Sequence, residues 1–214
     1  MTDEARRTTD EALFEAYRKG NEEALETLVE RHHDHLVRFL YRMLGDRQAV
    51  DDVFQDAFLQ VHLRSHTFDA TRRFRPWLFT IAANKARDYL RSRTRRRSFE
   101  VSVDVPIAGR DGSVSLVDLL EGERMSPDAG MSAEERDRMV QSAIDSLSPT
   151  LRESLLLAYF QRLTYAQIAD ELGIPLGTVK SRLHAAVAGF AKRWRELSAK
   201  EAGVEARERD GGAA

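Results

Sequence analysis

Residues 164–186 read TYAQIADELGIPLGTVKSRLHAA, which is two short helical patterns separated by residues 173–175. Thr164 and Gln167 have the spacing of a capping box that begins a helix. Gly173 can adopt the left-handed backbone that a sharp turn requires, and the small Ala169 allows a second helix to cross closely. These features predict a helix-turn-helix, a motif whose second helix can lie in the DNA major groove.

The second helix of this motif has one apolar side and one polar side. Val179 and Leu183, four residues apart, would attach it to its own domain. The opposite side carries hydroxyl and basic groups that can bind phosphates or base edges. The residues predicted to contact duplex DNA are Thr178, Lys180, Ser181, Arg182 and His184. Two other interpretations stay open, a plain helical hairpin and a helix-turn-helix used for protein contact.

The composition limits the class of protein. The chain has 214 residues, 42% of them apolar and 32% charged, with a net charge of −2. One or two small domains with packed cores fit these values. The absence of cysteine excludes disulfides, thiolate metal sites and cysteine nucleophiles. We see no signal segment and no apolar run long enough for a membrane span, and therefore expect a cytoplasmic protein without membrane insertion.

Apolar residues at helical spacing predict helices over about 11–44, 46–63 and 75–96 and a series of helices between 132 and 194, with new starts near Ser148 and Thr164, and no strand alternation is evident. Asn21 is a plausible N-cap and Gly45 a helix stop. Residues 72–97 hold ten bases and one acid, whereas residues 98–133 hold two bases and seven acids. We therefore predict an all-α protein of two small helical domains, 1–97 and 132–198, the second a helix-turn-helix. A flexible acidic linker, 98–131, would join them, and a disordered tail, 199–214, would follow.

The segment from Phe68 to Arg97 interleaves aromatic and basic residues. Aromatic rings that stack on bases, together with a cationic track for phosphates, suit single-stranded nucleic acid. For Trp77 and Tyr89, packing in the core is an equally good interpretation.

The predicted helix over 46–63 carries acids on its polar side. Asp51, Asp52, Gln55 and Asp56 follow at short helical spacings, which suggests a docking face for a basic protein partner, although a simply solvated face stays open.

Residues 32–35, His-His-Asp-His, invite a metal hypothesis but have no evident third ligand. The sequence contains no motif of a nucleotide-binding loop, a hydrolase or a zinc protease. A hydrolase using His32 or the acids has no other support, so we predict no enzyme, no metal and no cofactor.

Three motifs in order carry a family resemblance: AVDDVFQDAF (49–58), FRPWLFTIAANKARDYLRSR (74–93) and LTYAQIADELGIPLGTVKSRLHAA (163–186). Over about residues 10–97 and 132–196 the chain resembles bacterial RNA polymerase sigma factors of the extracytoplasmic-function (ECF) class. The resemblance implies a sigma factor that binds core RNA polymerase and directs promoter-specific transcription initiation. The alternative is a stand-alone helix-turn-helix regulator that binds duplex DNA without polymerase.

The resemblance also implies roles for particular residues. Asp51, Asp52, Gln55 and Asp56 would bind core polymerase. The minus-ten element of the promoter would be bound by Phe68, Arg72, Arg73, Arg75, Trp77, Asn84, Lys85, Arg87 and Arg91. The minus-thirty-five element would be bound by the second helix of the helix-turn-helix. An anti-sigma factor is a further partner common in this class.

One stretch departs from the family pattern. Members often carry more bases after the Ser181-Arg182 pair, whereas residues 185–188 here are apolar. Either minus-thirty-five binding is weak, or these residues dock against a protein or another part of the chain.

Overall fold

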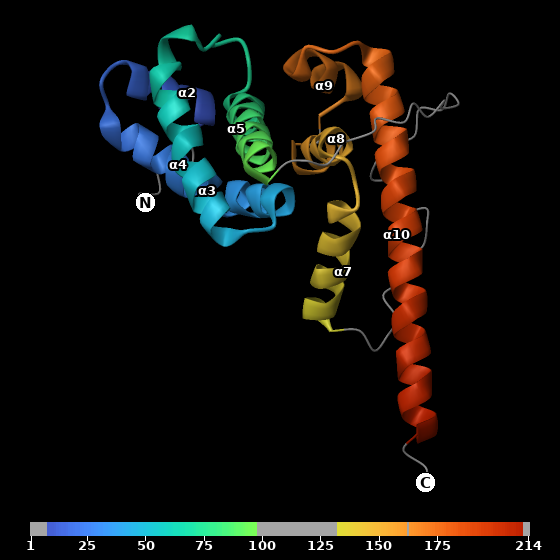
Figure 1. Cartoon of the computed structure of the whole chain (residues 1–214). Coiled ribbons are helices and arrows are strands. Elements are labelled where there is room, and N and C mark those ends of the chain that lie inside the picture. Colours follow the sequence, from blue (N-terminus) through green and yellow to red (C-terminus); the bar gives the residue numbers. More distant parts are fainter. Residues whose placement is uncertain (1–7, 98–131, 162, 212–214) are drawn as a thin grey trace. The chain divides into compact units, whose positions relative to one another are not determined.

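The computed structural model of the chain describes residues 8–97, 132–161 and 163–211. In the first of these ranges the backbone is helical apart from short connections, and Figure 1 shows its helices gathered together, each touching others of the group. The elements are α2 (Asp10–Arg18), α3 (Glu22–Leu44), α4 (Arg47–Leu63), the 3-10 turn η1 (Ser65–Thr67) and α5 (Phe74–Arg97). Together with the helices of the second half, and with no strand in the described ranges, they confirm the predicted all-α class.

Local sequence signals set the ends of these helices. Thr9 accepts a hydrogen bond from the Ala12 N–H and so caps α2, and Asp46 does the same for α4 through Ala49 N–H. Gly45 ends α3 with a φ of 68°, in the left-handed region where glycine is favoured, as predicted. Asn21 occupies the predicted position before α3, but its side chain makes no capping hydrogen bond.

The centre of the N-terminal helices is an aromatic cluster. The Phe14 ring of α2 lies 4.8 Å from Phe74 and 5.1 Å from Phe68, measured between ring centroids. Phe68 also lies 4.8 Å from Trp77. Phe14 and Phe74 are fully buried. Because large aromatic side chains contribute much of the apolar area that folding removes from water, this cluster fixes α2 against the start of α5.

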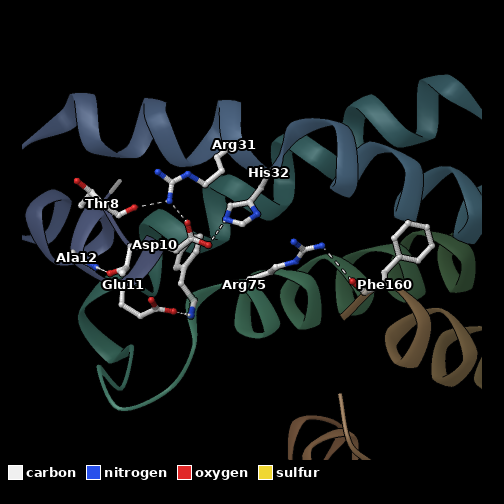
Figure 2. A network of polar contacts seen from close by, with 10 residues as sticks. Thr8, Asp10, Glu11, Ala12, Arg31, His32, Arg75 and Phe160 are labelled. Carbon is white, nitrogen blue, oxygen red and sulfur yellow. Dashed lines mark hydrogen bonds and ion pairs between the residues drawn. The ribbon is translucent and has the colours of Figure 1, made fainter. Parts of the chain in front are cut away.

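A polar network joins the first turn of α2 to α3 (Figure 2). The two carboxylate oxygens of Asp10 bind different partners, Arg31 Nη1 at 2.6 Å and His32 Nε2 at 2.9 Å. Arg31 also donates to the carbonyl of Thr8 at 2.9 Å. His32 is buried and Asp10 is largely covered. The sequence raised His32 as part of a metal hypothesis, whereas in the structure it pairs with a carboxylate of its own domain.

This network predicts a pH-dependent contribution to stability. Burial raises the pKa of Asp10, but the hydrogen bonds and charges of His32 and Arg31 outweigh burial and hold that pKa below its ordinary value of 3.8. A carboxylate whose pKa is lower in the folded state than in the unfolded state stabilises the fold at pH values above its unfolded-state pKa. This contribution is lost as the pH falls through the folded-state pKa. We expect Asp10→Asn to lower the unfolding free energy by about 1–3 kcal/mol at neutral pH. The deficit should shrink below about pH 4, in melts recorded between pH 7 and 3; a deficit independent of pH would contradict this account.

The second half of the chain is also helical. Its elements are α7 (Ala133–Asp145), α8 (Pro149–Gln161), α9 (Tyr165–Leu172) and α10 (Leu176–Gly211). A capping box of Ser132 with Glu135 begins α7. Helix α10 runs on to Gly211, past residue 199, where we expected a tail without regular structure. Residues 197–209 are rich in Ala, Glu, Lys and Arg and contain no proline, so their helix propensity favours the continuation despite Gly203.

The chain folds into two compact units, whose boundaries fall inside α8 and α10. Among the described residues, 8–97 with 156–161 and 163–176 form one unit, and 132–155 with 177–211 form the other. In the second unit Asp145 and Arg152 form an ion pair at 3.2 Å, and Leu147 packs so closely on Gly189 that a Cβ there would lie 2.9 Å from its Cδ2. The domain limits expected from composition stay a prediction, and the predicted linker lies outside the described residues.

Candidate nucleic-acid and protein-binding surfaces

The acidic side of α4 is exposed. Asp51, Asp52, Gln55 and Asp56 all face solvent, while the apolar positions of the same helix are buried. Those buried positions are Ala49, Val50, Val53, Ala57, Phe58 and Val61. At about 100° per residue, the four polar residues lie within one side of the helix. The geometry that a docking surface needs is therefore present.

Two leucines that the sequence did not predict to be exposed extend this side. Leu59 is 56% exposed and Leu63 is 55% exposed, although both are large apolar residues. They follow Gln55 and Asp56 at spacings of three to eight positions and share their side of α4. We call Asp51, Asp52, Gln55, Asp56, Leu59 and Leu63 the α4 face. The sequence did contain a signal that Leu59 and Leu63 are exposed, because both fall outside the buried apolar stripe of this amphipathic helix.

The loop before α5 is shaped by its own side chains. Asp69 Oδ1 accepts hydrogen bonds from the Thr71 N–H at 2.9 Å and the Thr71 hydroxyl at 2.7 Å. Both hydrogen bonds lower the pKa of Asp69, and the one from the Thr71 backbone N–H has the larger effect. The turn is followed directly by the exposed residues Arg72 and Arg73. Arg72 pairs with Asp170 at 2.7 Å and with Glu171 at 3.7 Å, both from α9 in the same unit. A DNA phosphate would have to replace these carboxylates.

Phe68 requires a correction. We expected its ring to contact the minus-ten element, but only 6% of the residue is exposed. Its ring packs edge-on against Phe14 and lies beside Trp77, so in this structure it supports the loop and has no surface for stacking on a base. The alternation of aromatic and basic residues does not reveal which rings point inward.

Most other candidates along α5 are accessible. Asn84 and Arg91 are exposed, and the remaining candidates are partly exposed: Arg75, Trp77, Lys85 and Arg87. The Arg75 guanidinium lies 5.5 Å from the centroid of the Phe79 ring. Trp77 packs on Phe14 and Phe68 with part of its surface and leaves the rest accessible, so it combines the two interpretations left open by the sequence. Tyr89 is also half-buried.

The helix-turn-helix signals are present in the structure. The capping box of Thr164 with Gln167 begins α9, and Gly173 ends it with a φ of 62°. The Ile174 N–H then donates to the carbonyl of Ala169 at 3.0 Å, which closes the turn before α10 begins at Leu176. Leu176, the first residue of α10, is 44% exposed.

The start of α10 carries the predicted duplex-binding residues. Val179 and Leu183 are buried as predicted. Ser181 is exposed and its hydroxyl donates to the Thr178 carbonyl at 3.0 Å. The other candidates, Thr178, Lys180, Arg182 and His184, are partly exposed. In the apolar run 185–188, Ala186 and Val187 are buried, so half of the run belongs to the core and the run as a whole is not a free docking patch.

Other site types find no support in the described part of the chain. Within those ranges no three His, Cys, Asp or Glu residues are grouped so that they could hold a metal ion. None of the helices there has the length and apolarity needed to cross a membrane.

Comparison with known proteins decides the family. The model of Sigma-70 region 2 matches residues 28–96, and that of Sigma-70 region 4 matches residues 137–188. The ECF RNA polymerase sigma-E factor of Escherichia coli (strain K12) is 32% identical over 175 residues, which are 82% of this chain and 88% of that protein. The chain belongs to the ECF sigma factors. ECF RNA polymerase sigma factor SigW of Bacillus subtilis (strain 168) is 29% identical over 180 residues, 84% of this chain and 94% of SigW.

Solved structures agree with this assignment. CnrH, in complex with the cytosolic domain of CnrY, has a TM-score of 0.59 and 26% identity over 86% of this chain and 95% of that one. The protein is thus a sigma factor that directs promoter-specific transcription initiation, with core RNA polymerase and promoter DNA as its partners. Region 2 covers the α4 face and α5, region 4 covers the helix-turn-helix, and α2 precedes both matches.

Proposed function

We propose that this sigma factor divides its work among three surfaces and catalyses no reaction itself. The α4 face binds core RNA polymerase. The loop at 69–73 and α5 bind the opened minus-ten element. The start of α10 binds the minus-thirty-five element as duplex. The protein acts in the cytoplasm, where bacterial polymerase and promoters lie.

The observation that best supports this division is the composition of the α4 face. It joins exposed carboxylates to two exposed leucines on one side of a helix. Charged groups around an apolar centre are typical of protein interfaces, in which buried apolar contacts contribute affinity and charges contribute orientation and rate. A surface that was only solvated would have no need of the leucines.

The DNA-binding surfaces are supported by the kinds of side chain that each presents. Along α5, the partly exposed Trp77 can stack on an unpaired base, and Asn84 can both donate to and accept from a base edge. Exposed arginines beside them supply phosphate contacts. At the start of α10, Lys180 and Arg182 are long enough to reach phosphates or guanine edges in the major groove.

The segment that separates the two modules in the sequence has a role in this proposal. The predicted linker, residues 98–131, carries a net charge of −5, counted as two bases and seven acids. A linker of this kind raises the effective concentration of one module near the DNA once the other is bound. Its negative charge would also favour basic walls of the polymerase over DNA itself.

An anti-sigma factor is a further partner in this proposal. The CnrH structure contains the cytosolic domain of CnrY, and a sigma factor RpoE of Bartonella quintana with the same fold was solved in complex with the anti-sigma factor NepR. By analogy, a partner of this kind would compete for the surfaces that polymerase and DNA need. Tagged protein recovered from its own cells should carry such a partner when its promoters are silent.

Reconstitution tests the proposal as a whole. Purified protein mixed with core polymerase should select DNA from a random library and give transcripts that begin a fixed distance downstream of the selected sequence. Core polymerase alone is the control. If the protein binds the selected duplex tightly without polymerase and yields no transcripts, the stand-alone regulator would be the better description.

A further inference from the structure

The N-terminus of α5 is capped by a side chain from a distant part of the chain. Glu11 Oε1 of α2 accepts a hydrogen bond from the N–H of Phe74 at 2.9 Å. Phe74 is the first residue of α5, so its N–H has no partner within the helix. A carboxylate there also interacts favourably with the positive end of the helix dipole.

Glu11 is itself held in place. Its neighbour Asp10 fastens the first turn of α2 to α3 through Arg31 and His32, as Figure 2 shows. The ring of Phe74 is fully buried and lies 5.8 Å from the His32 ring. The backbone and the side chain of Phe74 are therefore both fixed by groups from outside α5.

Phe74 lies at a functional junction. The loop at 69–73, with Arg72 and Arg73, ends directly before it, and Trp77 follows one turn later in α5. Any change in the direction of the first turn of α5 would move the loop and the Trp77 ring relative to each other. Contacts that must engage one DNA strand at the same time are sensitive to such shifts.

We propose that Glu11 is a positioning residue for minus-ten recognition. Its carboxylate holds the first turn of α5 so that the 69–73 loop and Trp77 meet the opened strand in one fixed arrangement. Glu11 touches no DNA in this role and acts through the N–H of Phe74. The inference rests on the proposed function of α5, and it assigns a role to α2, which precedes the residues matched by region 2.

Substitutions of Glu11 separate the hydrogen bond from the charge. Glu11→Gln keeps an oxygen acceptor and removes the charge, whereas Glu11→Ala removes both. Glu11 contacts the backbone of Phe74, which Arg73 and Arg75 flank in the sequence, and loss of a negative charge there should by itself strengthen binding to DNA. Loss of charge alone cannot explain weaker DNA binding by Glu11→Ala, because it would make binding stronger. Weaker binding therefore reports on positioning.

The experiment uses the holoenzyme and a defined probe. Wild-type holoenzyme first selects a 12-nucleotide single strand from a random pool, and fluorescence anisotropy then measures the affinity of each variant for the selected strand and for a scrambled one. We expect Glu11→Ala to bind the selected strand about tenfold more weakly, the size of one hydrogen bond to a charged group. Binding to the scrambled strand and to core polymerase should not weaken. Glu11→Gln should stay within about twofold of wild type.

Glu15→Ala is the matched control, because Glu15 lies on the same helix and its carboxylate pairs with Arg18 and Lys19 at the end of that helix. It should bind as wild type does.

Should Glu11→Ala prove poorly folded in a thermal melt, Glu11→Asp replaces it. The shorter side chain keeps the charge but loses reach, and this variant should lose affinity for the selected strand at a native melting temperature. Wild-type affinity in Glu11→Ala, or equal losses in the Gln and Ala variants, overturns the inference. If the wild-type holoenzyme selects no single strand, the proposed role of α5 fails first and the inference with it.

Discussion

Reversing Asp52 and Asp56 together to lysine should reduce the capture of core polymerase by at least about a hundredfold. The two carboxylates are exposed on the α4 face, so the variant turns attraction into repulsion without disturbing the buried side of the helix. Loss of one partner from a close interfacial charge pair costs about 2–5 kcal/mol, and two are changed here. Competition with wild-type protein for a limiting amount of core polymerase measures the loss.

The chain offers a closely matched control. Glu26 and Glu30 are exposed acids on α3 with the same spacing of four residues. Reversal of this pair changes the net charge by the same amount and should leave capture unchanged. Equal losses in the two double variants would mean that overall charge, and not the α4 face, governs binding.

Leu59→Ser tests the apolar part of the face separately and should weaken capture by about 1–2 kcal/mol. The thermal stability should stay close to wild type, because the side chain is 56% exposed.

Replacing Arg182 by alanine should weaken promoter-dependent transcription about 5–150-fold, which corresponds to about 1–3 kcal/mol for one specific base or phosphate contact. Arg182 is partly exposed near the start of α10 and directly precedes the buried Leu183. Transcription is to be compared on two templates, a selected promoter and the same promoter with its minus-thirty-five element scrambled. The loss should appear on the first template and be small on the second.

Lys192→Ala provides the control for charge. Lys192 is exposed on the same helix, ten residues or about 15 Å beyond Arg182, and lies outside the region 4 match. Its removal takes away one positive charge without touching the proposed DNA-binding end. A loss by Arg182→Ala on both templates, or an equal loss by Lys192→Ala, would argue against recognition of the minus-thirty-five element by Arg182.

Much of the candidate site could be predicted from the sequence, because the spacing of apolar residues in an amphipathic helix indicates which side is exposed. Asp52 and Asp56 could be placed on the surface of α4 because the apolar residues around them repeat at a different phase. The same logic failed for Phe68, which lies in a loop where no periodicity separates inside from outside. It also passed over Leu59 and Leu63, because an apolar residue is by default assigned to a core.

The sequence alone determined most of the helices and those of their ends that carry a local cap, although α10 continues past its predicted end. The capping boxes at Ser132 and Thr164 and the left-handed glycines Gly45 and Gly173 act through hydrogen bonds that span three to five residues, so local order along the chain is enough to reveal them. Only the tertiary structure decided which distant groups meet. The contact of Glu11 with Phe74 crosses 63 positions, and the packing of Phe14 on Phe68 crosses a comparable distance in the chain. Such pairs are selected by the packing of whole helices, which depends on all apolar side chains at once and leaves no local pattern in the sequence.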